Sequence, residues 1–214
     1  MEERLRLLSR AMQAGIVAVA VAGVATDNLT WVPAAVFSLV VSLIPSILRR
    51  DLHITLPIEL NFWIMLALFL HVAGGFSGFY NSVPGWDHLT HLMSSSLIGA
   101  LGLVIVVVID KYVKSIYLPR PFLAFFIVMF TMAMGVLWEI MEFANDSIAH
   151  TMLQYSLADT MIDLLFDGFA GIIVALAGVQ YLLRVSADHF VASLNVDEAK
   201  EKIAGYIQKR KGTT

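Results

Sequence analysis

Carboxylate and histidine side chains recur at helical spacing in three segments of the sequence. Residues three or four positions apart share one face of a helix, so each segment would present its polar groups together. These residues are Asp87, His91, Glu139, Glu142, Asp159, Asp163 and Asp167. Helical bundles bind metal ions with carboxylates and imidazoles that face one another in this way. The spacing therefore predicts a polar site where the three segments meet.

The ligand chemistry indicates a divalent metal ion at this site. Oxygen ligands suit Mg²⁺ or Mn²⁺, and one or two imidazoles also permit Zn²⁺ or Fe²⁺. The predicted metal ligands are Asp87, His91, Glu139, Glu142 and Asp163. A metal-bound water would be the nucleophile, and a remaining carboxylate, Asp159 or Asp167, would be the catalytic base. No organic cofactor is expected, because the sequence has no P-loop and no Gly-x-Gly-x-x-Gly motif.

The segments that carry these carboxylates contain no Lys or Arg near them. All 14 Lys and Arg residues fall before residue 11 or in the segments after residues 48, 109 and 183. Several carboxylates that face one another at low dielectric cannot all ionise unless protons or a metal ion neutralise them. The cluster is therefore expected to bind cations or to share protons.

The segments that must position these residues are apolar. Of the 214 residues, 58% are hydrophobic and only 14% are charged, whereas a soluble domain carries about 25% charged residues. This composition excludes a soluble globular enzyme and a disordered chain. The absence of cysteine excludes disulfides, thiolate metal sites and a cysteine nucleophile.

Six apolar stretches are long enough to cross a membrane, which takes roughly 17–25 residues per helix. They span residues 10–26, 32–48, 56–73, 87–109, 121–144 and 157–183. Continuous apolar runs predict helices, because a membrane barrel would need short alternating strands. The expected fold is therefore an all-α, polytopic membrane bundle of six transmembrane helices.

The basic residues also predict the orientation of the bundle. With six spans, every Lys and Arg lies on one side, and the positive-inside rule places that side in the cytoplasm. We therefore expect a multi-pass protein of the plasma (inner) membrane with both termini cytoplasmic and the acidic site facing outside. Residues 1–185 would form the transmembrane domain and 186–214 a cytoplasmic tail with a short amphipathic helix. The hydrophobic positions of this tail are Phe190, Leu194, Ile203, Tyr206 and Ile207.

The runs around the polar residues resemble a known membrane-protein family. Trp86-Asp87-x-x-x-His91, Trp138-Glu139-Ile140-x-Glu142-Phe143 and Asp159-Thr160-x-x-Asp163 are similar to motifs of the YjdF-like inner-membrane family and, more distantly, of VanZ-like proteins. The resemblance covers about residues 80–180. It implies an integral membrane protein with one polar cluster, carried over as Asp87, His91, Glu139, Glu142, Asp159 and Asp163, and it implies no particular reaction. The chain departs from the VanZ-like pattern at Asp167, where a neutral amide or small residue is more usual, and in lacking the Arg before the last motif.

Three functions remain open on these observations. The first is a metal-dependent membrane hydrolase or transferase that acts on a lipid or lipid-linked substrate. The second is a transporter that conducts protons or cations along Asp159, Asp163 and Asp167. The third is a non-catalytic membrane interaction protein. Membrane lipids are the expected partners and a homo-oligomer is compatible with the sequence, whereas the basic residues give no support to nucleic-acid binding.

Overall fold

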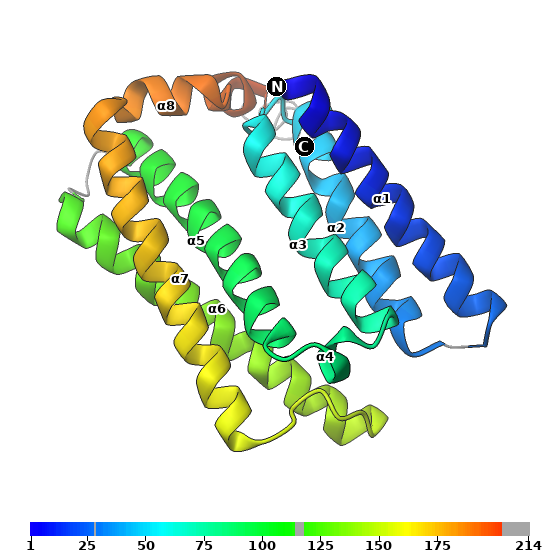
Figure 1. Ribbon diagram of the computed structural model, residues 1–214. Coiled ribbons are helices and arrows are strands. Elements are labelled where there is room, and N and C mark those ends of the chain that lie inside the picture. Colours follow the sequence, from blue (N-terminus) through cyan, green and yellow to red (C-terminus); the bar gives the residue numbers. More distant parts are fainter. Residues whose placement is uncertain (28, 114–117, 203–214) are drawn as a thin grey trace, which may run out of the picture. The chain divides into compact units, whose positions relative to one another are not determined.

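The computed structural model describes residues 1–27, 29–113 and 118–202, and all regular elements in these ranges are helices (Figure 1). In chain order they are α1 (Glu2–Ala25), the 3₁₀ turn η1 (Leu29–Trp31), α2 (Val32–Asp51), α3 (Ile58–Phe76), α4 (Phe79–Ser82), α5 (Trp86–Tyr112), α6 (Arg120–Ala149), α7 (Leu157–Arg184) and α8 (Ala187–Ser193). Within the described residues, α1, α2 together with η1, α3, α5, α6 and α7 are long and apolar enough to cross a membrane. The predicted all-α polytopic bundle is confirmed.

Several of the long helices extend past the predicted apolar stretches. α1 begins at Glu2 rather than at residue 10, and α6 continues to Ala149 rather than ending at residue 144. Hydropathy marks only the part of a helix that fits the hydrocarbon, whereas the polar turns beyond it remain helical. In the first turn of α1, Glu2 and Glu3 favour the helical conformation through the helix dipole.

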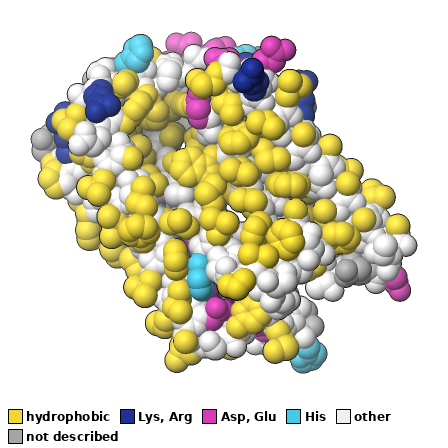
Figure 2. All heavy atoms as spheres, in the orientation of Figure 1, with side chains coloured by type: hydrophobic (Ala, Val, Ile, Leu, Met, Phe, Trp, Pro, Cys, Tyr) yellow, Lys and Arg dark blue, Asp and Glu magenta, His cyan; other side chains and the backbone are white. Residues whose placement is uncertain are grey.

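Large hydrophobic side chains lie exposed on the long helices. Phe37 on α2 is 63% exposed, and Leu165 on α7 is 72% exposed. Figure 2 shows hydrophobic side chains over much of the visible face. Contiguous apolar surface of this kind is a liability in water and is compatible with contact to lipid. The chain is therefore a multi-pass membrane protein.

The contacts within the chain group it into two units. The first unit consists of Met1–Gly78 together with the segment from Ser186 onward, and the second unit is Phe79–Val185. In the first unit α1, α2 and α3 contact one another pairwise (Figure 1). Its core consists of Ile16, Ala35, Met65 and Val72.

The segment after Val185 packs within the first unit. Phe190 and Leu194 are buried, and the carbonyl oxygen of Leu194 accepts a hydrogen bond of 3.0 Å from the backbone nitrogen of Thr55. His53 Nδ1 lies 2.8 Å from Glu198 Oε1. The other predicted hydrophobic tail positions, at 203, 206 and 207, lie outside the described residues. The division into a transmembrane domain over 1–185 and a tail over 186–214 stays a prediction.

The second unit contains the predicted polar residues. Its long helices α5, α6 and α7 contact one another pairwise and alternate in direction (Figure 1). The approach of α6 to α7 is close at Gly135, where a Cβ atom would collide with the carboxylate of Asp167. Because directions alternate, the starts of α5 and α7 lie at the same end of the unit as the end of α6. The predicted polar residues of all three helices therefore lie toward one end.

Candidate metal-binding site

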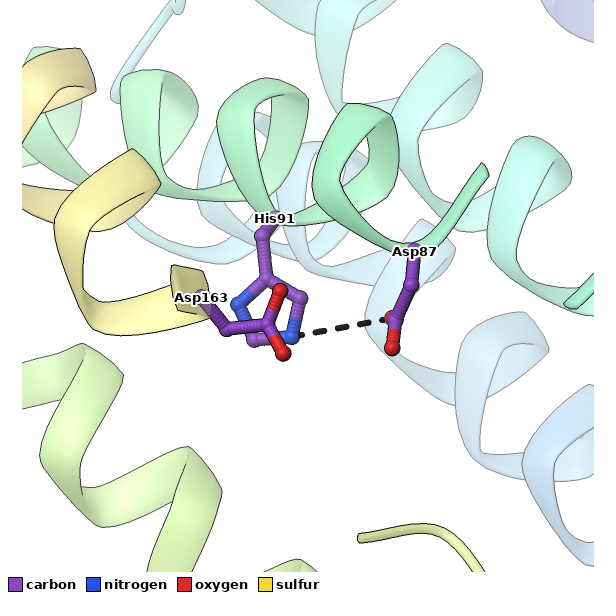
Figure 3. Close-up of side chains that lie close together, drawn as sticks. All are labelled: Asp87, His91 and Asp163. Atoms are coloured by element: carbon purple, nitrogen blue, oxygen red, sulfur yellow. Dashed lines mark ion pairs between the residues drawn. The ribbon is translucent and has the colours of Figure 1, made fainter. Parts of the chain in front are cut away.

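Asp87 and His91 on α5 and Asp163 on α7 form a compact group (Figure 3). Each offers one ligand atom, and these atoms lie within 4.8 Å of one another. His91 Nε2 is 3.8 Å from Asp87 Oδ1, the pair joined by the dashed line in Figure 3. Two carboxylates and one imidazole at such distances can hold a divalent metal ion.

Helix starts fix the depth of this group. Gly85, with φ of +77°, supplies the left-handed residue from which α5 departs, so Asp87 lies in the first turn of α5. Ser156 caps α7 by accepting a hydrogen bond of 3.2 Å from the backbone nitrogen of Asp159. At 1.5 Å per residue, Asp163 lies about 9 Å and Asp167 about 15 Å inside α7. The group therefore lies within the first turns of α5 and α7, toward one end of the second unit.

Asp167 and Ser95 orient the imidazole of His91. Asp167 is fully buried, and its Oδ1 lies 3.3 Å from His91 Nδ1 and accepts a hydrogen bond of 2.5 Å from Ser95 Oγ. A carboxylate accepts hydrogen bonds, so Nδ1 carries the proton in a neutral His91 and the Nε2 lone pair points toward Asp87. Metal-bound histidines are held in this way by a carboxylate on the other ring nitrogen.

Glu139 on α6 also points toward His91. It is 5% exposed, and its Oε1 lies 3.9 Å from His91 Nε2. This oxygen is buried and has no hydrogen-bond partner within the described part of the chain. Burying an unpaired carboxylate oxygen costs on the order of several kcal/mol. The space between Glu139, His91 and Asp87 is therefore one that a cation would stabilise.

The second oxygen of Glu139 is held by Gln154, which the sequence analysis missed. Gln154 Nε2 donates hydrogen bonds to Glu139 Oε2 at 3.0 Å and to the Glu139 carbonyl at 3.1 Å. Asp146 fixes this segment by accepting hydrogen bonds from the backbone nitrogens of Leu153 and Gln154 and from Thr151 Oγ1. No spacing in the sequence indicates this contact, because it depends on how the chain turns back after α6.

His88 was also not among the predicted site residues. Its Nδ1 lies 2.9 Å from Asp163 Oδ1, and its ring stacks on Phe166 with a centroid distance of 5.1 Å. A histidine that donates to a ligand carboxylate orients that carboxylate. The sequence places His88 at the edge of the helical face that carries Asp87 and His91, and this position alone does not show a partner.

The other predicted site residues lie around the compact group rather than in it. Glu142 accepts a hydrogen bond of 2.9 Å from Trp138 Nε1 on its own helix. Asp159 is half-buried in the first turn of α7. Asp167 contacts His91 from the side opposite to the ligand group. The structure thus brings together three of the five predicted ligands, with Glu139 adjacent, and the roles assigned to Glu142, Asp159 and Asp167 stay predictions.

A surface hollow of about 390 Å³ adjoins the group at Asp87. Its lining includes Asp159 and the aromatic residues Tyr80, Trp86 and Tyr155. The pKa values of Tyr80 and Tyr155 are raised, chiefly by burial and further by the charge of nearby carboxylates that include Asp87. Both tyrosines therefore remain protonated hydroxyls at neutral pH.

The opposite end of the second unit is apolar inside. Below Asp167 the interior contains Thr131, whose hydroxyl donates to the carbonyl of Ile127 on its own helix. Beyond Thr131, the buried residues that the structure describes in this unit are apolar: Leu103, Val106, Val107, Leu123, Ile127, Val174, Ala175 and Leu182, with Gly178. The polar cluster has no continuation through this region.

Comparison with known proteins agrees with this architecture. Residues 7–184 match DUF2238, a family of predicted membrane proteins. A Thermotoga maritima protein that is described as uncharacterized is 32% identical over 126 residues, which are 58% of this chain and 63% of that protein. The match thus spans less than two thirds of that relative. No solved structure matches the chain significantly.

The chain belongs to the DUF2238 family, because the match covers most of its length. DUF2238 is the family of the YjdF-like proteins, so this match agrees with the resemblance predicted from the sequence. The more distant similarity to VanZ-like proteins stays a prediction.

Proposed function

We propose that this member of the DUF2238 family binds a divalent metal ion through Asp87, His91 and Asp163 and uses it for hydrolysis or group transfer on a lipid or lipid-linked substrate. One observation carries the proposal. The buried Glu139 Oε1 has no hydrogen-bond partner in the described chain and faces the Nε2 of His91, beside two further carboxylates. A cation at this point would compensate for the burial of these groups.

Three protein ligands with an open position are typical of a catalytic rather than a structural metal site. The metal would polarise the substrate and lower the pKa of a bound water. Glu139 would then act as general base, since Gln154 holds its Oε2 while Oε1 faces the ligand group. The water oxygen would form the new bond to phosphorus or carbonyl carbon while the bond from that atom to the leaving alkoxide breaks. Glu139 would take the proton from the water and pass it to the alkoxide.

The position of the site supports a substrate that reaches it from the membrane. The site lies roughly 9 Å inside α7 by helical rise, and α5, α6 and α7 present hydrophobic side chains around it. A lipid can bring its headgroup to this depth by moving sideways in the bilayer. With both termini in the cytoplasm, as the basic residues predict, the site would open toward the outer leaflet.

The transport alternative draws support from the line of aspartates on α7. Exposure falls from the half-buried Asp159 to Asp163 at 2% and Asp167 at 0%. Below Asp167, however, the described interior of the second unit is apolar apart from Thr131. We therefore propose chemistry at a closed site in preference to conduction.

Turnover measurements on two variants test the proposed chemistry. The purified full chain is reconstituted in vesicles, treated with a chelator, and assayed for release of lipid headgroups before and after addition of Zn²⁺, Mg²⁺, Mn²⁺ or Fe²⁺. We expect metal to restore turnover, Asp163→Asn to lose both metal and turnover, and Glu139→Gln to keep metal while turnover falls about 10²–10⁴-fold. Turnover that persists in the chelated protein, or is unchanged in Glu139→Gln, would refute the proposal.

A further inference from the structure

The hollow beside Asp87 lies where spanning helices meet the membrane surface. Its lining comes from the segment that leads into α5, from Tyr155 just before α7, and from Asp159 in the first turn of α7. Lipid headgroups occupy this level of a bilayer. Its volume of about 390 Å³ lies within the usual range for sites of small ligands.

The lining is negatively charged and aromatic. Asp87 and Asp159 are its carboxylates, and the part of the chain that the structure describes contributes no Lys or Arg to it. His88 also lines it, and its Nδ1 lies 2.9 Å from Asp163 Oδ1. In the described second unit the basic residues lie at the other helix ends, and Lys111 is about 36 Å along α5 from Asp87. This separation exceeds the Debye length of about 8 Å in physiological salt, so those cations do not offset the negative charge of the hollow.

Aromatic rings beside carboxylates suit one ligand chemistry in particular. Tyr80, Trp86 and Tyr155 contribute to the lining, and the Tyr155 hydroxyl is fixed by donating a hydrogen bond of 3.3 Å to Asn81 Oδ1. Electron-rich aromatic faces and carboxylates together attract ammonium groups, which include the quaternary ammonium of choline. Without a bound metal ion, an anionic group would meet repulsion from Asp87 and Asp159 instead.

We infer that the hollow binds the ammonium group of an amine-bearing substrate, so that its neighbouring ester bond lies at the metal-binding group. The inference rests on the proposed function, which places the reacting bond at the metal-binding group. Asp87 belongs both to that group and to the lining of the hollow, so the two sites adjoin. It names the substrate class as a compound with an ethanolamine-like or choline-like headgroup. The ammonium is carried either by a membrane lipid or by a soluble amine.

Binding measurements on the detergent-purified full chain test the ammonium site directly. Choline and ethanolamine are titrated by calorimetry, with glycerol 3-phosphate as the anionic probe, into chelator-treated wild type, Asp159→Asn, Tyr155→Leu and the control Asp110→Asn. Asp110 lies near the opposite end of α5. We expect the amines to bind and the anion not to bind, and we expect each hollow variant to weaken amine binding about fivefold. The control should match wild type.

Absence of amine binding, a preference for the anion, or equal amine binding in wild type and both hollow variants would overturn the inference. Two hollow variants are used so that misfolding of one, seen as aggregation on size exclusion, leaves the other as the test. Binding to vesicles of phosphatidylethanolamine and of phosphatidylglycerol then shows whether the ammonium group is carried by a membrane lipid or by a soluble amine. Amine binding with preferential retention of phosphatidylethanolamine indicates a lipid, and amine binding without lipid preference indicates a soluble amine.

Metal content measured on the same proteins without chelator treatment separates this inference from the proposed function. A protein that holds metal but does not bind amines would disprove the ammonium site and leave the metal proposal standing. A protein that binds amines but takes up no metal would disprove the metal proposal and keep the hollow as an ammonium site.

Discussion

The first unit buries neutral polar groups, whereas the second unit buries ionisable ones. In the first unit Gln13 Nε2 donates to Ser42 Oγ at 2.9 Å, and Ser42 Oγ donates to the Leu39 carbonyl at 2.7 Å. In the second unit Glu139 and Asp167 are buried and each keeps an oxygen without a partner in the described chain. Hydroxyls satisfied by their own helix need no ligand. Carboxylates at the same depth need a cation or a proton.

Each unit contains three spanning helices that contact one another pairwise, although those of the second unit are longer, so the difference does not come from the number of helices. Among the described residues the buried carboxylates all belong to the second unit, which therefore has a region in which charge must be neutralised. Variants in the two units therefore separate effects of packing from effects of the bound cation.

The largest expected effect is on the packing that holds Asp167. Gly135→Val places side-chain atoms where the Asp167 carboxylate lies, so either the carboxylate or the helices α6 and α7 must move. We expect a loss of stability of about 3 kcal/mol or more, measured as a lower Tm in detergent.

Gly168→Ala on α7 is the matched control, since its Cβ would lie 3.6 Å from the Met132 Sδ atom, an ordinary contact. A Tm for Gly135→Val equal to that of Gly168→Ala would show that α6 and α7 are not in close contact at Asp167.

Addition of metal should stabilise the protein through the second unit. At a metal concentration 100 times the Kd, binding contributes about 2.7 kcal/mol, so the Tm should rise. The rise should disappear in Asp163→Asn, which removes a ligand, and persist in Ser42→Ala, which alters only the polar contacts of the first unit. An identical rise in all three proteins would show that the metal acts elsewhere.

The contact between Asp167 and His91 should affect metal affinity without abolishing it. Asp167→Asn weakens the acceptor that keeps the proton on His91 Nδ1, and such partners contribute about 10–100-fold to metal affinity. Equilibrium dialysis against metal measures the change. Ser96→Ala serves as the control, because the Ser96 hydroxyl donates to the carbonyls of Leu92 and Met93 on its own helix. Unchanged affinity in Asp167→Asn would remove this residue from the site.

The smallest expected effect concerns Gln154. Gln154→Leu frees Glu139 Oε2 while leaving Asp87, His91 and Asp163 in place. We expect turnover to fall about tenfold at unchanged metal affinity, because a loosely held base is less well placed to accept a proton. A fall in metal affinity equal to that of Asp163→Asn would instead assign Glu139 as a ligand.

Much of the fold could be predicted from the sequence, because the hydropathy of a spanning helix depends only on the residues of that stretch. The six apolar stretches correspond to the six long helices, and the errors lie at polar ends such as those of α1 and α6. Helical spacing likewise predicts that Asp87 and His91 share a face, which is a property of one helix.

Contacts between segments could not be predicted in the same way. The bond from Gln154 to Glu139 depends on the turn that Asp146 stabilises after α6, and the bond from His88 to Asp163 depends on how α5 packs against α7. Helical spacing within one segment carries no information about either. The distinction between Asp163 in the compact group and Asp167 behind His91 also requires the packed helices.

Metal analysis of the purified full chain tests whether Asp87, His91 and Asp163 hold a divalent metal ion. The protein is equilibrated in turn with Zn²⁺, Mg²⁺, Mn²⁺ and Fe²⁺, separated from free metal, and measured by elemental analysis beside Asp163→Asn and Ser42→Ala. We predict stoichiometric binding of at least one of these metals by wild type and Ser42→Ala, and its loss in Asp163→Asn. Wild-type protein that retains none of the four metals, or Asp163→Asn that retains as much as wild type, would contradict this prediction.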